Sequence, residues 1–301
     1  MKISSNLVRD CRRHYASELE TIYGYDEANA LIMILLEHYF GIDRVKIAME
    51  PELRLSESEM LTLHFAVKEL LKNKPIQYII GETEFCGMRF LVNENVLIPR
   101  PETEEMVQMI VSRRDKACLV RTGRDVKTDG RPSILDIGTG SGCIAISLAK
   151  LLKDSVVTAV DVSEKALEVA KKNADANNVD VRFVLDDILN PQNPELIENQ
   201  YDIIVSNPPY VCESEKSEMR ANVLDYEPSS ALFVSDNDPL IFYRKILEFA
   251  QKALKPDGEV WFEINEKFGA EMKDLCDIMG FKNVETIKDF RERDRFLRAT
   301  R

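Results

Sequence analysis

The sequence predicts an α/β fold in which a small helical bundle and a short β-hairpin linker precede a parallel sheet. Three observations predict it. Apolar residues recur at helical spacing over residues 1–74, with no strand-like alternation. Glycine and proline separate short apolar runs over residues 75–100. From residue 133 onward, near-continuous apolar strands alternate with helical segments, which is typical of βαβ units covered on both faces.

The composition is that of a globular protein with enough apolar residues for two cores. The 301-residue chain is 45% hydrophobic and 31% charged, which excludes disordered, fibrous and disulfide-scaffold proteins. Its 40 basic and 52 acidic residues give a net charge of −12. This balance argues against strong non-specific binding to phosphate backbones, although one face can still carry a basic patch.

The chain carries no predicted membrane span, signal peptide or metal site. No apolar run approaches the ~20 residues that cross a bilayer, and the N-terminus lacks an apolar signal region. The six cysteines are scattered without a CxxC pair, and the three histidines lie near the N-terminus. We therefore expect a reducing, cytoplasmic environment.

The N-terminal segment, residues 1–74, is expected to form four or five helices. Ser56 followed by Glu59 forms a capping box, which predicts that one helix starts there and runs to about Lys72.

The next two segments contain more glycine and proline. We interpret the apolar runs Ile76–Ile80, Met88–Val92 and Val96–Ile98 as parts of a β-hairpin linker. Residues 112–132 are basic and show no period, so a surface loop is expected there.

The remaining segments alternate between the two types of secondary structure. Strands are predicted at 133–137, 156–160, 181–185, 201–205, 259–264, 283–287 and 295–300. Helices are predicted at 142–153, 163–176, 239–254 and 267–279.

A glycine loop follows the first of these strands. The run DIGTGSG ends at Gly142, and its spacing is GxGxG, because Cys143 stands where a dinucleotide fingerprint needs glycine. Asp161 ends the next strand, where its two oxygens can each accept a ribose hydroxyl. This arrangement suits S-adenosylmethionine, which has a ribose and an adenine but no pyrophosphate. The alternative is that the glycines are plain turn residues.

Two residues after the third strand are predicted to lie beside the adenine. Asp187 can accept a hydrogen bond from the exocyclic amine, and Ile188 can pack against the ring. Asp186 fits a solvated loop acid nearly as well as a ligand.

The fourth strand ends in the motif Asn207-Pro208-Pro209-Tyr210, which carries the predicted chemistry. An amide nitrogen is a poor nucleophile because its lone pair is delocalised. The side-chain oxygen of Asn207 and the carbonyl of Pro208 can accept its two hydrogens and direct the lone pair toward a methyl donor. Tyr210 can stack on the planar group. The alternative is a rigid turn with a packed tyrosine.

The order DIGTGSG, VDVS and SNPPY resembles that of amino-methylating, S-adenosylmethionine-dependent methyltransferases. The resemblance is closer to the HemK/PrmC family, the glutamine-N5 methyltransferases of class I peptide-chain release factors. It rests on further segments of this chain: KPIQYIIG at 74–81, Glu84-Phe85, LIPRPETE at 97–104 and YEPSSAL at 226–232.

The resemblance implies a seven-stranded Rossmann-like class I methyltransferase sheet with a reversed last strand. It implies a helical substrate-docking domain at 1–74, a hairpin linker at 75–100 and a methyltransferase domain at 101–301. The substrate is expected to be the glutamine of a Gly-Gly-Gln loop in a class I release factor. We expect a monomer with no membrane partner and no direct nucleic-acid substrate.

The family pattern also assigns site residues. The methionine part of the cofactor is expected at Gly138, Thr139, Gly140, Ser141 and Gly142, the ribose at Asp161, and the glutamine amide at Asn207, Pro208, Pro209 and Tyr210. Two departures stand out: the position of Ile188 is often aromatic in this family, and residues 112–132 form a longer segment than usual.

Several charged residues near these motifs have open roles. Glu102 and Glu104 fit either hydrogen bonds near the cofactor or the first turn of a helix after Pro101, and the helix is favoured for Glu104. No role is assigned to Arg100. The pair Glu227-Pro228 fits a substrate mouth and a fixed loop equally well.

Three other functions compete with this one. A nucleic-acid methyltransferase acting on adenine N6 or guanine N2 would use the same chemistry, but it calls for a basic or base-stacking surface. A non-catalytic adaptor that binds the cofactor only to stabilise itself is disfavoured, because Asn207 and Asp161 are both intact. An NAD-dependent oxidoreductase is disfavoured because Cys143 replaces the third glycine of the dinucleotide fingerprint. The sequence also shows no proton-donating pair near a nicotinamide site.

Overall fold

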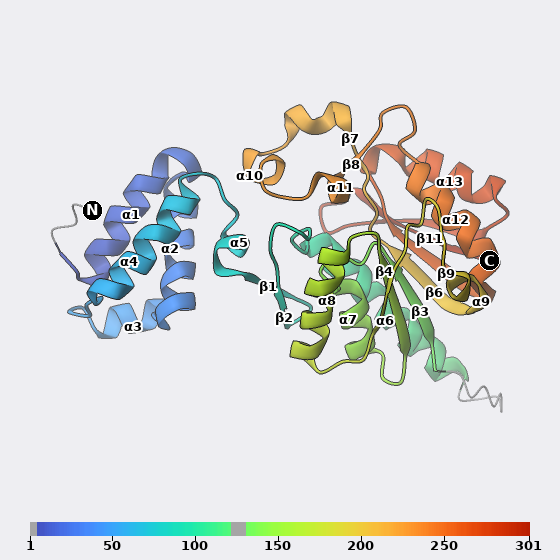
Figure 1. Ribbon diagram of the computed structural model, residues 1–301, viewed down its shortest axis with the longest axis horizontal. Helices are drawn as coiled ribbons and strands as arrows, with labels where there is room; N and C mark the ends of the chain where they lie inside the picture. Colours follow the sequence, from blue (N-terminus) through green and yellow to red (C-terminus); the bar gives the residue numbers. More distant parts are fainter. Residues whose placement is uncertain (1–4, 122–130) are drawn as a thin grey trace. The chain divides into compact units, whose positions relative to one another are not determined.

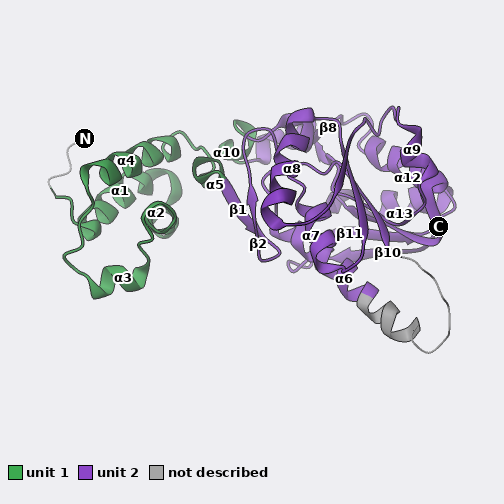
Figure 2. Cartoon of the chain, turned by 60° about the horizontal axis from the view of Figure 1, so that its bottom comes forward, with its two compact units in different colours: residues 1–81, 220–226 green, residues 82–219, 227–301 purple. Residues whose placement is uncertain are grey.

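The computed structural model describes residues 5–121 and 131–301, without the side chains of residues 115–121. The chain divides into two compact units, which Figure 2 colours separately. Unit 1 comprises residues 1–81 and 220–226, and unit 2 comprises residues 82–219 and 227–301. Among the described residues, no helix is both long enough and apolar enough to cross a membrane.

Unit 1 is a helical bundle around an apolar core that includes the fully buried Leu19 and Leu35. The predicted capping box is confirmed: the Glu59 amide donates to Ser56 Oγ over 3.3 Å, and the Ser56 amide donates to Glu59 Oε2 over 2.7 Å. The Tyr226 hydroxyl donates to the Lys72 carbonyl over 2.9 Å, which ties the second segment of the unit to the first. The helices are α1 (Val8–Tyr23), α2 (Tyr25–Phe40), α3 (Arg44–Met49), α4 (Glu57–Leu70), α5 (Ile76–Ile80) and α10 (Ala221–Leu224).

Helix α5 corrects one prediction. The run Ile76–Ile80 was expected in the hairpin, but it is helical. Ile76, Ile79 and Ile80 are spaced i, i+3 and i+4, and all three pack against the core of unit 1. A short apolar run fits a strand and a helix equally well, and this tertiary packing selects the helix.

The hairpin itself is real but shorter than predicted. Strands β1 (Glu82–Phe85) and β2 (Met88–Leu91) pair antiparallel across the turn Cys86-Gly87, where both residues have positive φ. The predicted run Val96–Ile98 is not a strand.

Helix α6 (Pro101–Arg121) corrects a second prediction, because residues 112–121 continue it instead of forming a loop. Met106, Val107 and Ile110 pack in the apolar core and anchor the start of the helix against the sheet. The helix therefore continues through residues 112–121 although these residues show no apolar periodicity. The rest of the predicted loop, through residue 130, lies outside the described residues.

Unit 2 contains the predicted sheet. Within the described residues, seven strands lie in the order β10-β11-β9-β6-β3-β4-β5. The pairs β3–β4, β3–β6, β4–β5 and β6–β9 are parallel, and β11 runs antiparallel to both of its neighbours. The reversed last strand is therefore confirmed. The strands are β3 (Ser133–Ile137), β4 (Val156–Asp161), β5 (Arg182–Leu185), β6 (Tyr201–Ser206), β9 (Leu254–Glu263), β10 (Lys282–Lys288) and β11 (Asp294–Thr300).

Helices cover both faces of the sheet (Figure 1). Successive residues of β6 point to opposite faces: Ile203 packs in one apolar cluster and Ile204 in the other. This leaves the carboxyl ends of β3, β4, β5 and β6 as one edge where loops meet. The remaining elements are α7 (Cys143–Leu151), α8 (Glu164–Asn177), α9 (Pro194–Glu198), α11 (Ser229–Leu232), α12 (Ile241–Ala253), α13 (Gly269–Ile278), β7 (Val211–Cys212), β8 (Phe233–Val234) and the 3-10 helices η1 (Glu213–Glu218) and η2 (Glu266–Phe268).

Candidate functional site

A cavity of about 550 Å³ lies in unit 2 at the carboxyl ends of the parallel strands. It collects predicted residues from the ends of four strands, as expected for a ligand site of an open α/β sheet. Those that line it are Gly138, Gly140, Asp161, Asp187, Ile188, Asn207, Pro208 and Pro209. Thr139, Ser141, Gly142 and Tyr210 do not line it.

Asp161 joins the end of β4 to the glycine loop. Its Oδ2 accepts the Gly140 amide over 2.8 Å, and its Oδ1 accepts the Ser163 amide over 2.9 Å. Each carboxylate oxygen still has lone-pair capacity toward the cavity. Burial raises the pKa of Asp161, against the hydrogen bonds from these amides.

Two glycines of the loop meet different surroundings. Gly140 has φ +55 and a side chain there would meet nothing within 4 Å, so its backbone forms an open wall of the cavity. Gly142 has φ +82, and a Cβ there would lie 2.8 Å from Ile146 Cδ1 and 3.1 Å from Ala170 Cβ. Gly140 thus allows a ligand to approach the backbone, whereas Gly142 allows α7 and α8 to pack.

Two buried carboxylates brace the loops around the cavity. Asp136 Oδ2 accepts the Thr139 hydroxyl over 2.6 Å and the Ala145 amide over 3.2 Å, and burial raises its pKa to about 7. Asp186 accepts three backbone amides that follow it in its own loop. Asp186 therefore fixes that loop, and both Asp186 and Asp187 line the cavity.

The motif after β6 is held by residues that the sequence reasoning missed. Asn207 Nδ2 donates to Thr103 Oγ1 over 3.1 Å, and Thr103 Oγ1 donates to Glu263 Oε2 over 2.6 Å. The Tyr210 hydroxyl donates to Glu263 Oε1 over 3.0 Å, and burial raises the pKa of Tyr210. A signal for Glu263 existed, because it is a lone acid near the end of the apolar strand VWFEI.

Comparisons with known proteins agree with this geometry. The family model of the PrmC N-terminal domain matches residues 10–81, and that of the methyltransferase small domain matches residues 122–225. Release factor glutamine methyltransferase of Flavobacterium psychrophilum is 44% identical, over 97% of this chain and 99% of its own length. That of Bacteroides thetaiotaomicron is 44% identical, over 94% and 96%. The chain belongs to the release factor glutamine methyltransferase family.

The predicted family is therefore confirmed, and with it the class of S-adenosylmethionine-dependent methyltransferases. Among solved structures, the catalytic domain of hMettl16 in complex with MAT2A 3'UTR hairpin 1 is similar with a TM-score of 0.51 and 17% identity, over 81% of this chain and 80% of that one. This likeness shows the fold alone.

An ion pair fixes the rim of the cavity in this family member. Arg100 donates to Glu227 Oε1 over 2.6 Å, and the Ile98 amide donates to Glu227 Oε2 over 3.3 Å. Leu97 and Pro228, which flank these groups, both line the cavity. The pair thus joins the IPRPETE and EPSS segments, and it gives Arg100 the role that the sequence left open.

Other residues near the rim are placed as follows. Glu102 and Glu104 lie in the first turn of α6, as favoured for Glu104. Phe242 and Ile246 of α12 add apolar lining that the sequence reasoning did not anticipate, and they lie in the same cavity as Ile188.

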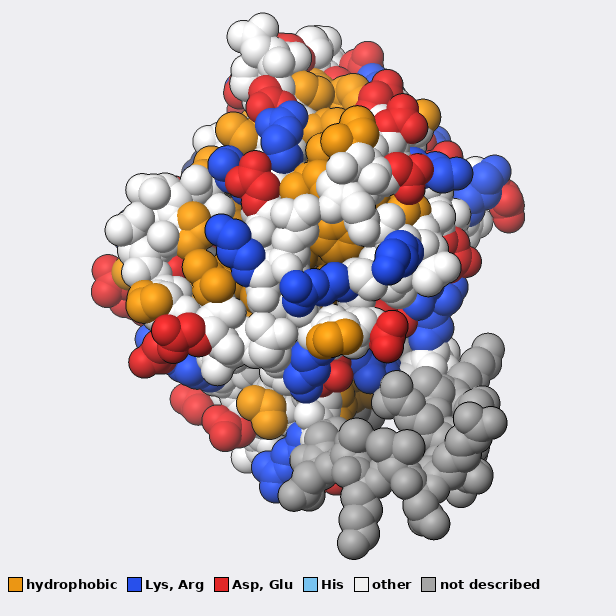
Figure 3. Space-filling model, turned by 90° about the vertical axis from the view of Figure 1, so that its right-hand side faces the viewer, with side chains coloured by type: hydrophobic (Ala, Val, Ile, Leu, Met, Phe, Trp, Pro, Cys, Tyr) orange, Lys and Arg blue, Asp and Glu red, His pale blue; other side chains and the backbone are white. Residues whose placement is uncertain are grey.

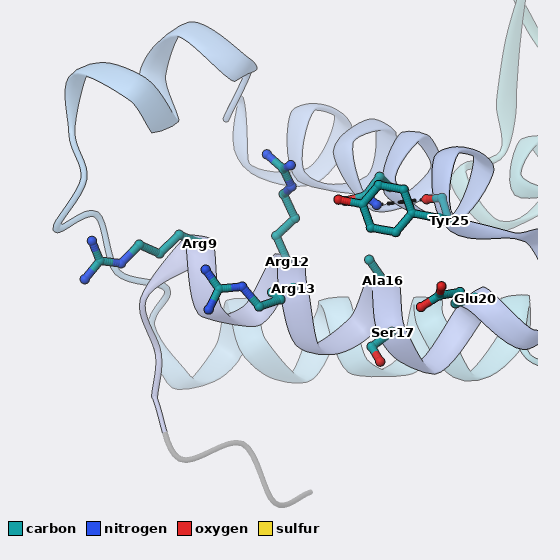
Figure 4. A pocket seen from close by; sticks show the side chains of 8 residues that line it. Arg9, Arg12, Arg13, Ala16, Ser17, Glu20 and Tyr25 are labelled. Atoms are coloured by element: carbon teal, nitrogen blue, oxygen red, sulfur yellow. Dashed lines mark hydrogen bonds between the residues drawn. The ribbon is translucent and has the colours of Figure 1, made fainter.

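A second cavity of about 500 Å³ lies in unit 1 and contains no predicted site residue. Arg9, Arg12 and Arg13 project from α1, and Tyr25 lies on α2 across from them (Figure 4). Tyr25 is 67% exposed. Arg9 pairs with Glu52 over 3.7 Å, and Glu20 also lines the cavity. Arg12 and Arg13 give the cavity its basic side in a chain of net charge −12.

Proposed function

We propose that this protein transfers a methyl group from S-adenosylmethionine to the side-chain amide nitrogen, N5, of the glutamine in the Gly-Gly-Gln motif of a class I release factor. The reaction is assigned to the cytoplasm. One observation carries the proposal: Asn207, Pro208 and Pro209 line the same cavity as the glycine loop and Asp161, in a member of this family.

The residues of the cavity fit the cofactor. The open backbone wall at Gly138 and Gly140 accommodates the methionine part, with Thr139, Ser141 and Gly142 shaping the loop from behind. Asp161 retains acceptors for the ribose hydroxyls, and Asp187 and Ile188 lie at the next strand end for the adenine. When bound, S-adenosylmethionine supplies a methyl group on a positively charged sulfur.

The protein's part in the reaction is to present the amide nitrogen. Asn207 accepts one N–H through its side-chain oxygen, and the Pro208 carbonyl accepts the other. Holding both hydrogens weakens conjugation with the carbonyl and turns the lone pair toward the methyl group. Pro209 keeps the backbone rigid. Tyr210 anchors the end of the motif through the hydrogen bond from its hydroxyl to Glu263. No general base is needed, since the nitrogen proton becomes acidic only once nitrogen carries the methyl group. That proton then passes to water, and the neutral thioether S-adenosylhomocysteine leaves.

Unit 1 is proposed to dock the protein substrate. Arg12 and Arg13, which line its cavity beside Arg9, suit carboxylate side chains on the surface of a release factor. A protein substrate also suits the surface charge: the face in Figure 3 carries basic side chains interspersed with acidic and hydrophobic ones. The net charge of −12 points the same way.

The test is methyl transfer from isotopically labelled S-adenosylmethionine to a purified class I release factor. The control is the same factor with alanine in place of the Gly-Gly-Gln glutamine, and ribosomal RNA is offered separately. We expect label in the unaltered factor only. Label in the RNA, or equal label in the control factor, would overturn the proposal.

A further inference from the structure

A chain of four polar side chains runs from the cavity into the core of unit 2. Asn207 at the cavity donates to Thr103, Thr103 donates to Glu263, and Tyr210 donates to the other oxygen of Glu263. The Asn207 to Thr103 and Thr103 to Glu263 distances are 3.1 and 2.6 Å. Thr103 and Glu263 are only 2% and 1% exposed, so water does not compete for these contacts.

The single proton of Thr103 gives the chain a direction. Each oxygen of Glu263 accepts a hydrogen bond, Oε1 from Tyr210 and Oε2 from Thr103, so Thr103 directs its proton to that carboxyl group. The Thr103 oxygen then has only lone pairs to offer Asn207. Asn207 must therefore turn its NH₂ group toward Thr103, which leaves its oxygen available to the cavity.

Glu263 is held in place from several sides. The Tyr243 hydroxyl donates to its backbone carbonyl over 3.0 Å. Burial raises the pKa of Glu263, while the hydrogen bonds from Thr103 and Tyr210 and the positive charge of Arg295 act in the opposite direction. Two donors and a neighbouring cation are the surroundings that a buried carboxylate requires.

We propose that Thr103 and Glu263 are positioning residues that fix which end of the Asn207 amide faces the substrate. The inference rests on the proposed function, in which the Asn207 oxygen accepts an N–H of the substrate glutamine. A reversed amide would present two hydrogens to that N–H and would hold no substrate amide. Glu263 orients Tyr210 at the same time, so one carboxylate aligns both ends of the motif.

The first experiment compares Thr103→Val, which keeps the shape and loses the hydroxyl, with Thr103→Ser, which keeps the hydroxyl. For Thr103→Val we expect kcat to fall about 10- to 100-fold, the loss that removing an outer hydrogen-bond partner causes at metal sites. The affinity for S-adenosylhomocysteine should stay within about twofold, because Thr103 does not line the cavity. Thr103→Ser should retain kcat within about threefold. Equal loss in both variants, or unchanged kcat in Thr103→Val, would overturn the inference.

A double-mutant cycle separates positioning from packing. If Thr103 acts through Asn207, adding Thr103→Val to Asn207→Ala costs little beyond Asn207→Ala alone. If the threonine merely supports the fold, the two losses multiply, and the inference fails.

Glu263→Gln is the second variant, because it is nearly isosteric and does not depend on how Thr103→Val folds. A glutamine has one acceptor oxygen where the carboxylate has two, so either Tyr210 or Thr103 loses its acceptor. We expect a lower kcat with cofactor affinity kept, and an unchanged kcat would overturn the inference.

The wild-type protein distinguishes this failure from failure of the proposed function. If the wild type modifies no release factor glutamine, the proposed function is wrong. If it does modify the glutamine and the variants behave additively, only the positioning inference is wrong.

Discussion

Gly142 allows two helices to pack, whereas Gly140 lines the cavity. Alanine at Gly142 should therefore lower stability, and alanine at Gly140 should weaken ligand binding. At Gly142 the added Cβ would lie 2.8 Å from Ile146 Cδ1 at φ +82. The left-handed backbone costs about 1–2 kcal/mol, and overpacking costs about 1–3 kcal/mol more. Gly142→Ala should therefore lower the free energy of unfolding by about 2–5 kcal/mol.

At Gly140 the same change meets no atom within 4 Å, so only the backbone term of about 1–2 kcal/mol applies. Its methyl group, however, would stand on the wall of the cavity. We expect the affinity of Gly140→Ala for S-adenosylhomocysteine to fall at least about tenfold, which is about 1.4 kcal/mol. Urea unfolding of the free variants and calorimetric titration with S-adenosylhomocysteine measure the two effects. Undiminished affinity in Gly140→Ala, or equal destabilisation by both changes, would refute this reasoning.

Three further predictions concern the motif, a buried acid and the docking surface. Asn207→Ala should lower kcat about 10²- to 10³-fold in single-turnover assays while binding S-adenosylhomocysteine normally, since it removes one preorganised partner of the amide; full activity would contradict the mechanism. Asp136 has a pKa of about 7 when folded against 3.8 as its ordinary value, so the folded state holds a proton that the unfolded state releases. The free energy of unfolding should therefore fall as the pH rises from 3.8 to about 7, by up to about 1.4 kcal/mol per pH unit. In urea unfolding, the stability of Asp136→Asn should depend less on pH than that of the wild type. An equal pH dependence in both proteins would refute the raised pKa of Asp136. Charge reversal of Arg12 and Arg13 should raise KM for the release factor about tenfold through lost charge pairing, and leave methylation of a short Gly-Gly-Gln peptide unchanged. Reversal of Arg44, outside that cavity, is the control, and an equal effect there would argue against the docking surface.

The sequence predicted the sheet and the cavity well because both depend on local signals. Apolar runs of strand length separated by helices determine a parallel sheet. Asp161 ends a strand, and the glycine loop and the Asn207 motif each follow one directly, so the topology alone brings them to one edge.

What the sequence did not reveal depends on tertiary packing. Residues 76–80 form a helix because their isoleucines reach the core of unit 1, which no local pattern reports. Thr103 and Glu263 are 160 residues apart in the chain, and only the folded sheet brings them within hydrogen-bond distance. The salt bridge between Arg100 and Glu227 depends on the same kind of long-range contact.

Peptide mass spectrometry of a class I release factor after incubation with the protein and S-adenosylmethionine tests the central claim most directly. The account predicts one added methyl group, located by fragmentation on the side chain of the Gly-Gly-Gln glutamine. A factor that remains unmodified while the protein demonstrably binds S-adenosylmethionine, or a methyl group on any other residue, would contradict it.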